Sequence, residues 1–440
     1  MKIKHPLAAG AAAAAALALT GTGLAATAQA APAPRAAHGT AAAKCPALTV
    51  SKGWYGDNKD RLQRLIDTRG RCGDSYDKRH KPLAVFDWDN TVIKNDVGDA
   101  TMFWMLRNGK IRTPERGDWR TTSRYLTAPA AKALAKACPA TGRTLPTRTN
   151  TACADEIAAV YGEGTTATGK DAFAGFDHRR MEPQYAWLAQ LLRGWSTARV
   201  KDFAAAARKE NLAAPIGAEQ RVGTGKVTAW ARYYDQQRDL IRTLKKAGFD
   251  VYVVSASPEP VAEVWAAGKE GVGLDARHTI GIRNVTREGR LTARLKGCGS
   301  VEDGADSMIT YIDGKRCAIN ERILGVRGKA AEKVQPAAER QVFAAGDSDT
   351  DVSFLRDATG LRLVLNRNKA ELMCRAYDNG DRRWLIQPMF IEPKGKQSAP
   401  YPCATTGYTG RDGTKAPVRR ADGSVIADQQ DTVYGGSATS

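Results

Sequence analysis

Short apolar runs that end in polar residues recur along the chain. Three of them carry the most information: residues 83–86 before Asp87 and Asp89, residues 251–254 before Ser255, and residues 342–345 before Asp347. Continuous apolar runs of this kind are typical of strands buried on both faces of a parallel sheet. Similar runs at 361–365 and 384–386 predict two more strands. The pattern therefore predicts an α/β fold with a parallel sheet, whose strands deliver polar side chains at their carboxyl ends, where such sheets bind ligands.

A long excursion separates the first two of these strands. A strand-helix-strand unit needs only about 30 residues, and many more lie between Thr91 and residue 251. The pieces in between, such as 130–137 and 198–208, are rich in Ala, Leu and Arg and show no strict alternation, which favours helices. We therefore expect a separate helical module at residues 97–228.

The remaining segments divide as follows. Residues 45–96 and 229–392 form the expected core, with a hairpin predicted from residues 278–285 and 289–295 around a Gly-containing turn. Residues 393–440 are poor in apolar side chains and are predicted to be an extended or disordered tail.

The amino-terminal residues predict export. Residues 1–30 have a basic start, an Ala/Leu-rich stretch and a small-residue cleavage site near Ala30, which together are typical of a secretory signal peptide. Residues 31–44 are Ala/Pro-rich and are predicted to be a disordered linker. No later run is long and apolar enough for a transmembrane segment. We expect a secreted, extracellular protein.

Cysteine usage fits that location. The eight cysteines fall into four couples that are local in sequence, each of which straddles a loop or excursion. Structural zinc is disfavoured because no Cys-x-x-Cys occurs. The expected disulfides are Cys45 with Cys72, Cys138 with Cys153, Cys298 with Cys317, and Cys374 with Cys403.

The formal net charge is +19. A basic extracellular protein is attracted weakly to anionic cell-surface polymers, although most of these charges are expected to be ordinary solvated surface. No motif places basic and aromatic residues in the register of a nucleic-acid-binding fold, so nucleic acid is not an expected partner. The sequence does not indicate the oligomeric state.

Asp87 and Asp89 predict the first chemistry. Side chains alternate along an extended backbone, so both carboxylates can point into one cleft while Trp88 points elsewhere. Two like charges at this separation repel each other. A divalent cation is the expected partner of such a carboxylate-rich site.

The ordered set of motifs resembles the haloacid dehalogenase (HAD) superfamily, most of whose members are phosphatases. Asp87-Trp88-Asp89-Asn90-Thr91 resembles its first motif, Ser255 stands in the place of the second, Gly328-Lys329 resembles the third, and Gly346-Asp347 with Asp351 resembles the fourth. Ordinary acidic caps at strand-to-helix turns would explain any one motif but not the set. The resemblance implies a Rossmann-like parallel-sheet core, and it identifies the inserted helical module as an α-helical cap of the first class.

The resemblance also implies roles for the motif residues. Asp87 would be the nucleophile and Asp89 the general acid and base. Thr91, Ser255, Ala256 and Lys329 would bind the phosphate. Mg²⁺ would be held by Asp87, Asp347 and the backbone carbonyl of Asp89, with Asp351 supporting the lysine or the metal's water shell. Asp349 has no assigned role.

Two groups within the superfamily are most similar. Phosphoserine phosphatases share the cap position and an acidic residue five after the threonine, here Asp96. Secreted bacterial phosphorylcholine phosphatases are similar at Asp87 to Thr91, at residues 252–256, at Tyr185-x-Trp187-x-Ala189-Gln190 and at residues 291–294. Asp96, Tyr185 and Trp187 are therefore candidate specificity residues. For Asp96, plain helix capping is an equal alternative, and for the two aromatic residues, ordinary core packing is the more common role.

These observations lead to one main hypothesis. It is a secreted Mg²⁺-dependent phosphatase that hydrolyses a small organic phosphate monoester, with phosphorylcholine as one candidate, through an aspartyl-phosphate intermediate. A broad-specificity acid phosphatase is the alternative within the enzyme class, and a non-catalytic, polyanion-binding surface protein is the alternative outside it. Dehalogenases of the superfamily lack the second aspartate, so Asp89 argues against that activity.

Overall fold

The computed structural model describes residues 45–140 and 142–436. The predicted signal peptide and linker at residues 1–44 lie outside the described residues. The core is a parallel sheet of six strands in the order β12-β11-β10-β1-β6-β7, which confirms the predicted α/β class. The strands are β1 (Leu83–Phe86), β6 (Asp250–Pro258), β7 (Thr279–Ile282), β10 (Phe343–Gly346), β11 (Leu361–Asn366) and β12 (Trp384–Pro388).

Strand β1 lies inside the sheet, between β10 and β6, and its side chains are buried on both faces. Ala84 and Phe86 belong to one hydrophobic cluster, and Leu83 and Val85 belong to the other, as the two-residue period of a strand requires. In register, Val85 lies between Tyr252 of β6 and Ala344 of β10. The strand is therefore buried on both faces, as the continuous apolar run predicts.

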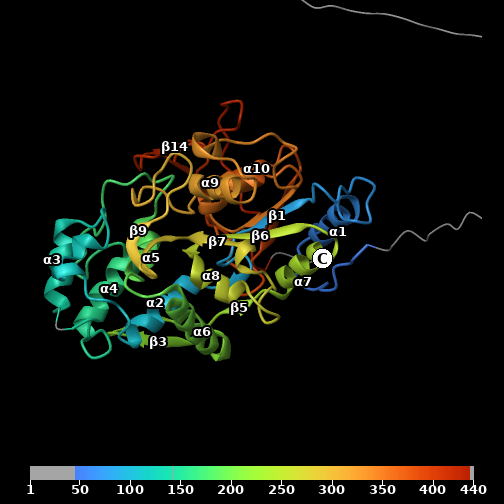
Figure 1. Cartoon of the computed structure of the whole chain (residues 1–440). Helices are drawn as coiled ribbons and strands as arrows, with labels where there is room; N and C mark the ends of the chain where they lie inside the picture. The colour runs from blue at the N-terminus through green and yellow to red at the C-terminus, as the bar shows by residue number, and fades with distance from the viewer. Residues whose placement is uncertain (1–44, 141, 437–440) are drawn as a thin grey trace, which may run out of the picture. The chain divides into compact units, whose positions relative to one another are not determined.

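Two sets of helices cover the sheet (Figure 1). One face packs against α1 (Asn58–Arg69), α7 (Asp235–Lys246) and α8 (Glu259–Ala266), and the other against α9 (Asp313–Arg322), α10 (Val352–Asp357) and α11 (Ala370–Asp378). Short 3-10 turns lie at η3 (Ala276–His278), η4 (Gly328–Glu332) and η5 (Asp349–Asp351).

The insertion between β1 and β6 is mainly helical. It contains α2 (Val97–Arg107), η1 (Glu115–Gly117), η2 (Trp119–Thr121), α3 (Ala128–Ala137), α4 (Thr151–Glu163), α5 (Pro183–Leu191) and α6 (Thr197–Ala213). A small hairpin that the sequence did not indicate, β3 (Glu219–Val222) with β4 (Gly225–Thr228), closes it. Two short antiparallel strands, β2 (Ile93–Lys94) and β5 (Arg232–Tyr233), pair where the insertion leaves and rejoins the core.

The predicted hairpin is correct in its turn and wrong in its first strand. Residues 279–282 join the main sheet as β7, and only β8 (Asn284–Arg287) pairs with β9 (Arg290–Leu295). The hairpin contacts α5, where Asn284 Nδ2 donates to the carbonyl of Ala189 at 2.8 Å. This segment of the core therefore packs against the helical insertion.

All four predicted disulfides form: Cys45–Cys72, Cys138–Cys153, Cys298–Cys317 and Cys374–Cys403. None of the described cysteines is free. The last pair joins α11 to the segment after residue 393.

The described part of that segment, residues 393–436, is extended rather than disordered. It contains the short pair β13 (Tyr408–Thr409) and β14 (Lys415–Ala416), and it buries Tyr401, Val418 and Ile426 in the cluster that covers one face of the sheet. Low apolar content suggested disorder, but the disulfide and these anchors are enough to hold it. No helix in the described ranges has the length and apolar character to cross a membrane.

Candidate active site

Asp87 and Asp347 meet because their strands are neighbours. Each follows directly on its strand, β1 or β10, and the backbone N–H of Asp87 donates to the carbonyl of Ala345 at 2.9 Å. Parallel neighbours end at the same edge of the sheet, so their terminal side chains converge. The carboxylates of Asp87, Asp347 and Asp351 all offer oxygens within 4.8 Å of one another.

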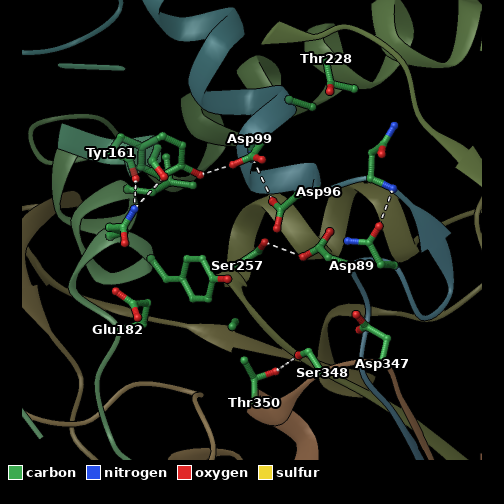
Figure 2. A pocket seen from close by; sticks show the side chains of 18 of the residues that line it. Asp89, Asp96, Asp99, Tyr161, Glu182, Thr228, Ser257, Asp347, Ser348 and Thr350 are labelled. Atoms are coloured by element: carbon green, nitrogen blue, oxygen red, sulfur yellow. Dashed lines mark hydrogen bonds between the residues drawn. The ribbon is translucent and has the colours of Figure 1, made fainter. Parts of the chain in front are cut away.

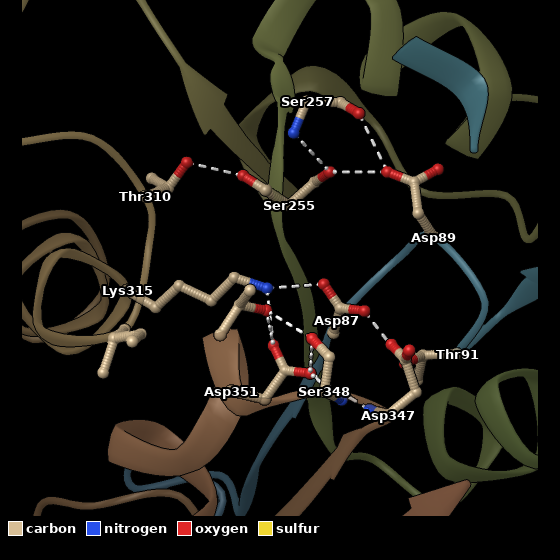
Figure 3. A network of polar contacts seen from close by, with 12 residues as sticks. Asp87, Asp89, Thr91, Ser255, Ser257, Thr310, Lys315, Asp347, Ser348 and Asp351 are labelled. Carbon is tan, nitrogen blue, oxygen red and sulfur yellow. Dashed lines mark hydrogen bonds and ion pairs between the residues drawn. The ribbon is translucent and has the colours of Figure 1, made fainter. Parts of the chain in front are cut away.

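A buried lysine joins this cluster, and it is Lys315 (Figure 3). Its Nζ lies 2.5 Å from Oδ1 of Asp87 and 2.7 Å from Oδ1 of Asp351. Lys315 is fully buried near the start of α9. The prediction of Lys329 is therefore corrected: Lys329 is exposed on η4, with no hydrogen bond or ion pair to the described carboxylates. Both lysines follow a glycine, but only Gly314-Lys315 opens a helix that faces the carboxyl ends of the strands.

Asp351 organises the turn after β10. Its Oδ2 accepts from the backbone N–H groups of Asp347 and Ser348, at 3.0 and 3.1 Å, while its Oδ1 holds Lys315. The turn passes so closely that a Cβ added at Gly346 would lie 2.7 Å from the Asp351 side chain. This close approach explains the glycine. The neighbouring Asp349 faces away and accepts from the N–H of Leu372, at the start of α11.

Thr91 links Asp87 to Asp347 rather than opening to the cavity. Its Oγ1 lies 2.9 Å from Oδ2 of Asp87 and 2.9 Å from Oδ1 of Asp347, and the residue is fully buried. A hydroxyl has one proton, so it can donate to only one of these oxygens. One buried carboxylate oxygen is therefore left without a donor, and a divalent cation with hard oxygen ligands fits that deficit.

Asp89 lines the same cavity as Asp87 but has different hydrogen-bond partners. Its Oδ1 accepts from the N–H of Val97 and its Oδ2 from the hydroxyl of Ser257, both at 2.8 Å. Ser255 lies further off at 3.4 Å from Oδ2 and is itself buried. Ala256 and Ser257 line the cavity. Ser257, two residues beyond the predicted hydroxyl, is thus the closer partner, and strand alternation places both on one side.

Burial dominates the electrostatics of the two aspartates. It raises the pKa of Asp87 to about 6, against the opposing effect of Lys315. Burial also raises the pKa of Asp89 well above its usual range, and the negative charge of Asp96 adds to the shift. Desolvation disfavours the charged carboxylate in each case. Asp89 is thereby favoured to hold a proton, while Asp87 keeps a cationic partner.

A cavity of about 460 Å³ opens in front of these residues. Figure 2 shows Asp89, Asp347 and Ser348 at one end and Asp96, Asp99, Tyr161 and Glu182 further out, towards the helical insertion. Phe103, Tyr185 and Trp230 add aromatic surface to the wall. The cavity therefore combines one carboxylate cluster at the sheet with a second acidic and aromatic region under the cap.

The three predicted specificity residues have different surroundings. Asp96 lines the cavity and also caps α2, because its Oδ1 accepts from the N–H of Asp99 at 2.9 Å. Tyr185 lines the cavity and is 37% exposed. Trp187 is fully buried away from the cavity, and its Nε1 donates to Thr122. Trp187 is therefore a core residue of the cap, and its prediction as a substrate contact is wrong.

One family model matches part of the chain. The family described as haloacid dehalogenase-like hydrolase matches residues 143–356. The match includes Ser255, Lys315, Asp347 and Asp351 but begins after Asp87 and Asp89. None of the curated proteins matches the chain.

Solved structures with a related fold share little sequence. A protein of unknown function from Anaerococcus prevotii is 17% identical, with 76% of this chain and 92% of that chain covered and a TM-score of 0.49. A Bordetella pertussis protein of unknown function is 18% identical, with coverages of 70% and 98% and a TM-score of 0.40. A substrate-bound phosphoserine phosphatase is 14% identical, with coverages of 65% and 86% and a TM-score of 0.28.

Proposed function

We propose that the chain is a phosphatase of the haloacid dehalogenase superfamily, and specifically a secreted, Mg²⁺-dependent phosphomonoesterase for a small substrate with a cationic head group. The observation that carries the proposal is the different environment of Asp87 and Asp89 in one cavity. Lys315 and Thr91 hold Asp87, whereas Asp89 faces the cavity with a raised pKa. A proposed nucleophile and a proposed proton donor therefore line one cavity.

Asp87 and Asp89 divide the reaction between them. An oxygen of Asp87 attacks phosphorus, the bond from phosphorus to the leaving oxygen breaks, and Asp89 gives its proton to that oxygen. In the second step Asp89 takes a proton from water, the water oxygen bonds to phosphorus, and the bond to Asp87 breaks to release inorganic phosphate. Because Ser257 and the N–H of Val97 both bind Asp89, the carboxyl keeps one orientation in both steps.

The metal assignment follows from the donor set. Asp87, Asp347 and the backbone carbonyl of Asp89 are the groups proposed to hold Mg²⁺, which would neutralise charge on the phosphate. Thr91 keeps two of these carboxylates together. Lys315 and Asp351 hold Asp87 from behind, so Asp351 supports the lysine in this proposal.

The head-group assignment rests on the outer part of the cavity. Asp96, Asp99 and Glu182 are its acids, and Tyr161 and Tyr185 supply aromatic faces. Carboxylates and aromatic rings both attract an ammonium ion, so phosphorylcholine is the substrate that we propose to test first. A broad-specificity acid phosphatase would gain nothing from these acids, which would repel most phosphate esters.

Four disulfides among the described residues support the extracellular location, because such bonds persist in oxidising compartments. Together with the predicted signal peptide, they support secretion as part of the proposal.

The test is a panel of phosphate monoesters assayed with and without a chelator. We expect phosphorylcholine to be hydrolysed with a higher kcat/KM than uncharged esters, and the chelator to abolish turnover. Asp87→Asn should remove activity on every ester, and beryllium fluoride, which mimics a phosphoryl group on a carboxylate, should inhibit the unmodified enzyme. Near-normal turnover of an aryl phosphate by Asp87→Asn would overturn the nucleophile assignment.

A further inference from the structure

The charge balance of the cavity is uneven. Six acidic residues line it: Asp87, Asp89, Asp96, Asp99, Glu182 and Asp347. Among the described residues on its wall, Arg367 is the single basic side chain. Lys315 is no substitute, because it is fully buried and already binds Asp87 and Asp351. A phosphate dianion that enters this cavity meets one exposed cationic group.

Arg367 is only partly engaged by the protein. Its Nη1 lies 2.5 Å from Oδ2 of Asp347, and the side chain is 28% exposed. Within the described ranges, Nε and Nη2 have no hydrogen-bond partner. Arginine carries its donors in a planar fork that can bind two groups at once. One side of the fork is therefore committed to Asp347, and the other remains available at the cavity wall.

The loop that carries Arg367 is held from both sides. Asn366 Nδ2 donates to Oδ1 of Asp431 at 3.1 Å and to the carbonyl of Val433 at 2.7 Å. On the other side, the hydroxyl of Tyr401 donates to Oδ1 of Asn368 at 2.9 Å. All three partners belong to the segment after residue 393, so that segment fixes the backbone on either side of Arg367. A binding group gains from being held in place before its ligand arrives.

We propose that Arg367 is a phosphate-binding residue outside the four motifs. Its free nitrogens take a non-bridging oxygen of the substrate's phosphate while Nη1 keeps Asp347 in place. Asp347 lies beside Asp87, so the guanidinium of Arg367 contacts a direct neighbour of the proposed nucleophile. The inference deepens the proposed function and rests on it, because it assigns a contact to the phosphate of the same substrate.

Calorimetric titration tests the contact without turnover. Inorganic phosphate is titrated into the full-length enzyme at saturating Mg²⁺, and Mg²⁺ is titrated separately without phosphate. Arg367→Gln should weaken phosphate binding about tenfold or more, the scale of a charge-assisted hydrogen bond. Arg367→Lys keeps the charge without the fork and should recover part of the affinity. Lys369→Gln is the matched control, because it removes an exposed positive charge two residues away and should leave phosphate binding within about twofold.

The Mg²⁺ titration separates phosphate binding from a purely positioning role. If Arg367 only orients Asp347, Arg367→Gln weakens Mg²⁺ binding and leaves phosphate binding at saturating Mg²⁺ unchanged, which overturns the inference. Equal phosphate affinity in all four proteins, with normal turnover by the unmodified enzyme, also overturns it and leaves the proposed function intact. If the unmodified enzyme hydrolyses no phosphate ester, the proposed function itself is wrong.

Discussion

Nζ of Lys315 lies 2.5 Å from Oδ1 of Asp87, although 228 residues separate the two in the chain. The contact joins the start of α9 to the end of β1 in a fully buried position. A buried ammonium group with two carboxylate partners remains charged, and the pKa of Lys315 is raised because Asp351 and Asp87 outweigh the opposing effect of burial. The pair therefore keeps Asp87 ionised and fixed at the cleft.

Replacing Lys315 should damage stability and catalysis together. Lys315→Met leaves Asp87 and Asp351 without their cation, and removing one member of a buried ion pair typically costs about 3–5 kcal/mol of the free energy of unfolding. Losing the ammonium group that fixes Asp87 also misplaces the proposed nucleophile, and a misplacement of about 1 Å can lower the rate by about 10²-fold. Urea unfolding and steady-state kinetics measure the two effects.

Lys329→Gln is the control for this prediction. Lys329 is exposed on η4, so its replacement should leave both the unfolding free energy and kcat nearly unchanged. The reverse result, with a large loss at Lys329 and none at Lys315, would contradict the arrangement around Asp87.

Asp89→Asn should separate the two chemical steps. An ester with a good leaving group needs little proton donation, so Asp87 can still attack its phosphorus, whereas the second step lacks a base to activate water. We expect a stoichiometric burst of the leaving group and a slow steady state. Acid-quenched enzyme should carry labile phosphate on Asp87, detectable by mass spectrometry. A steady rate without a burst would contradict the division of roles.

The sheet could be predicted because its signal is local. The apolar runs at 83–86, 342–345 and 361–365 are buried strands, and their polar ends meet because parallel neighbours share an edge. The disulfides could be predicted for a related reason, since each closes a short loop between cysteines that are close in sequence.

The rest of the site depends on packing that spacing does not encode. Gly314-Lys315 and Gly328-Lys329 look alike in sequence, and only the path of α9 decides which lysine reaches Asp87. Trp187 and Tyr185 lie two residues apart on α5, yet one is buried and the other lines the cavity. Arg367 carried no motif, because its partner Asp347 comes from another strand.

Asp96 serves two roles that a neutral replacement can separate. It caps α2 and also lines the cavity. Asparagine caps a helix about as well as aspartate, so Asp96→Asn should leave the unfolding free energy nearly unchanged. If Asp96 faces a cationic head group, KM for phosphorylcholine should rise while an uncharged aryl phosphate is nearly unaffected, because only the binding of the cation is lost. Equal losses on both substrates, or none on phosphorylcholine, would exclude the cation contact.

We expect Asp99 to make recognition of the proposed cationic head group dependent on pH. Burial raises the pKa of Asp99 to about 7, the charge of Asp96 adds to this shift, and the hydrogen bond from the Tyr161 hydroxyl at 2.6 Å opposes it. Below this value the carboxyl is neutral, and above it the carboxylate attracts an ammonium group. KM for phosphorylcholine should therefore fall as the pH rises from about 6 to about 8, because Asp99 with a pKa of about 7 loses its proton in this range.

Asp99→Asn supplies the comparison, because its amide oxygen can still accept from Tyr161 but cannot ionise. The variant should lose the difference in pH profile between phosphorylcholine and an aryl phosphate. Stability gives an independent check. The folded protein binds the proton more tightly than an unfolded aspartate, whose pKa is about 3.9, so unmodified protein loses stability as the pH rises from about 4 to about 7. Asp99→Asn should gain stability relative to the unmodified protein across that window. If the variant and the unmodified protein differ in KM and in stability by the same amount at pH 5 and at pH 8, Asp99 does not titrate in that range.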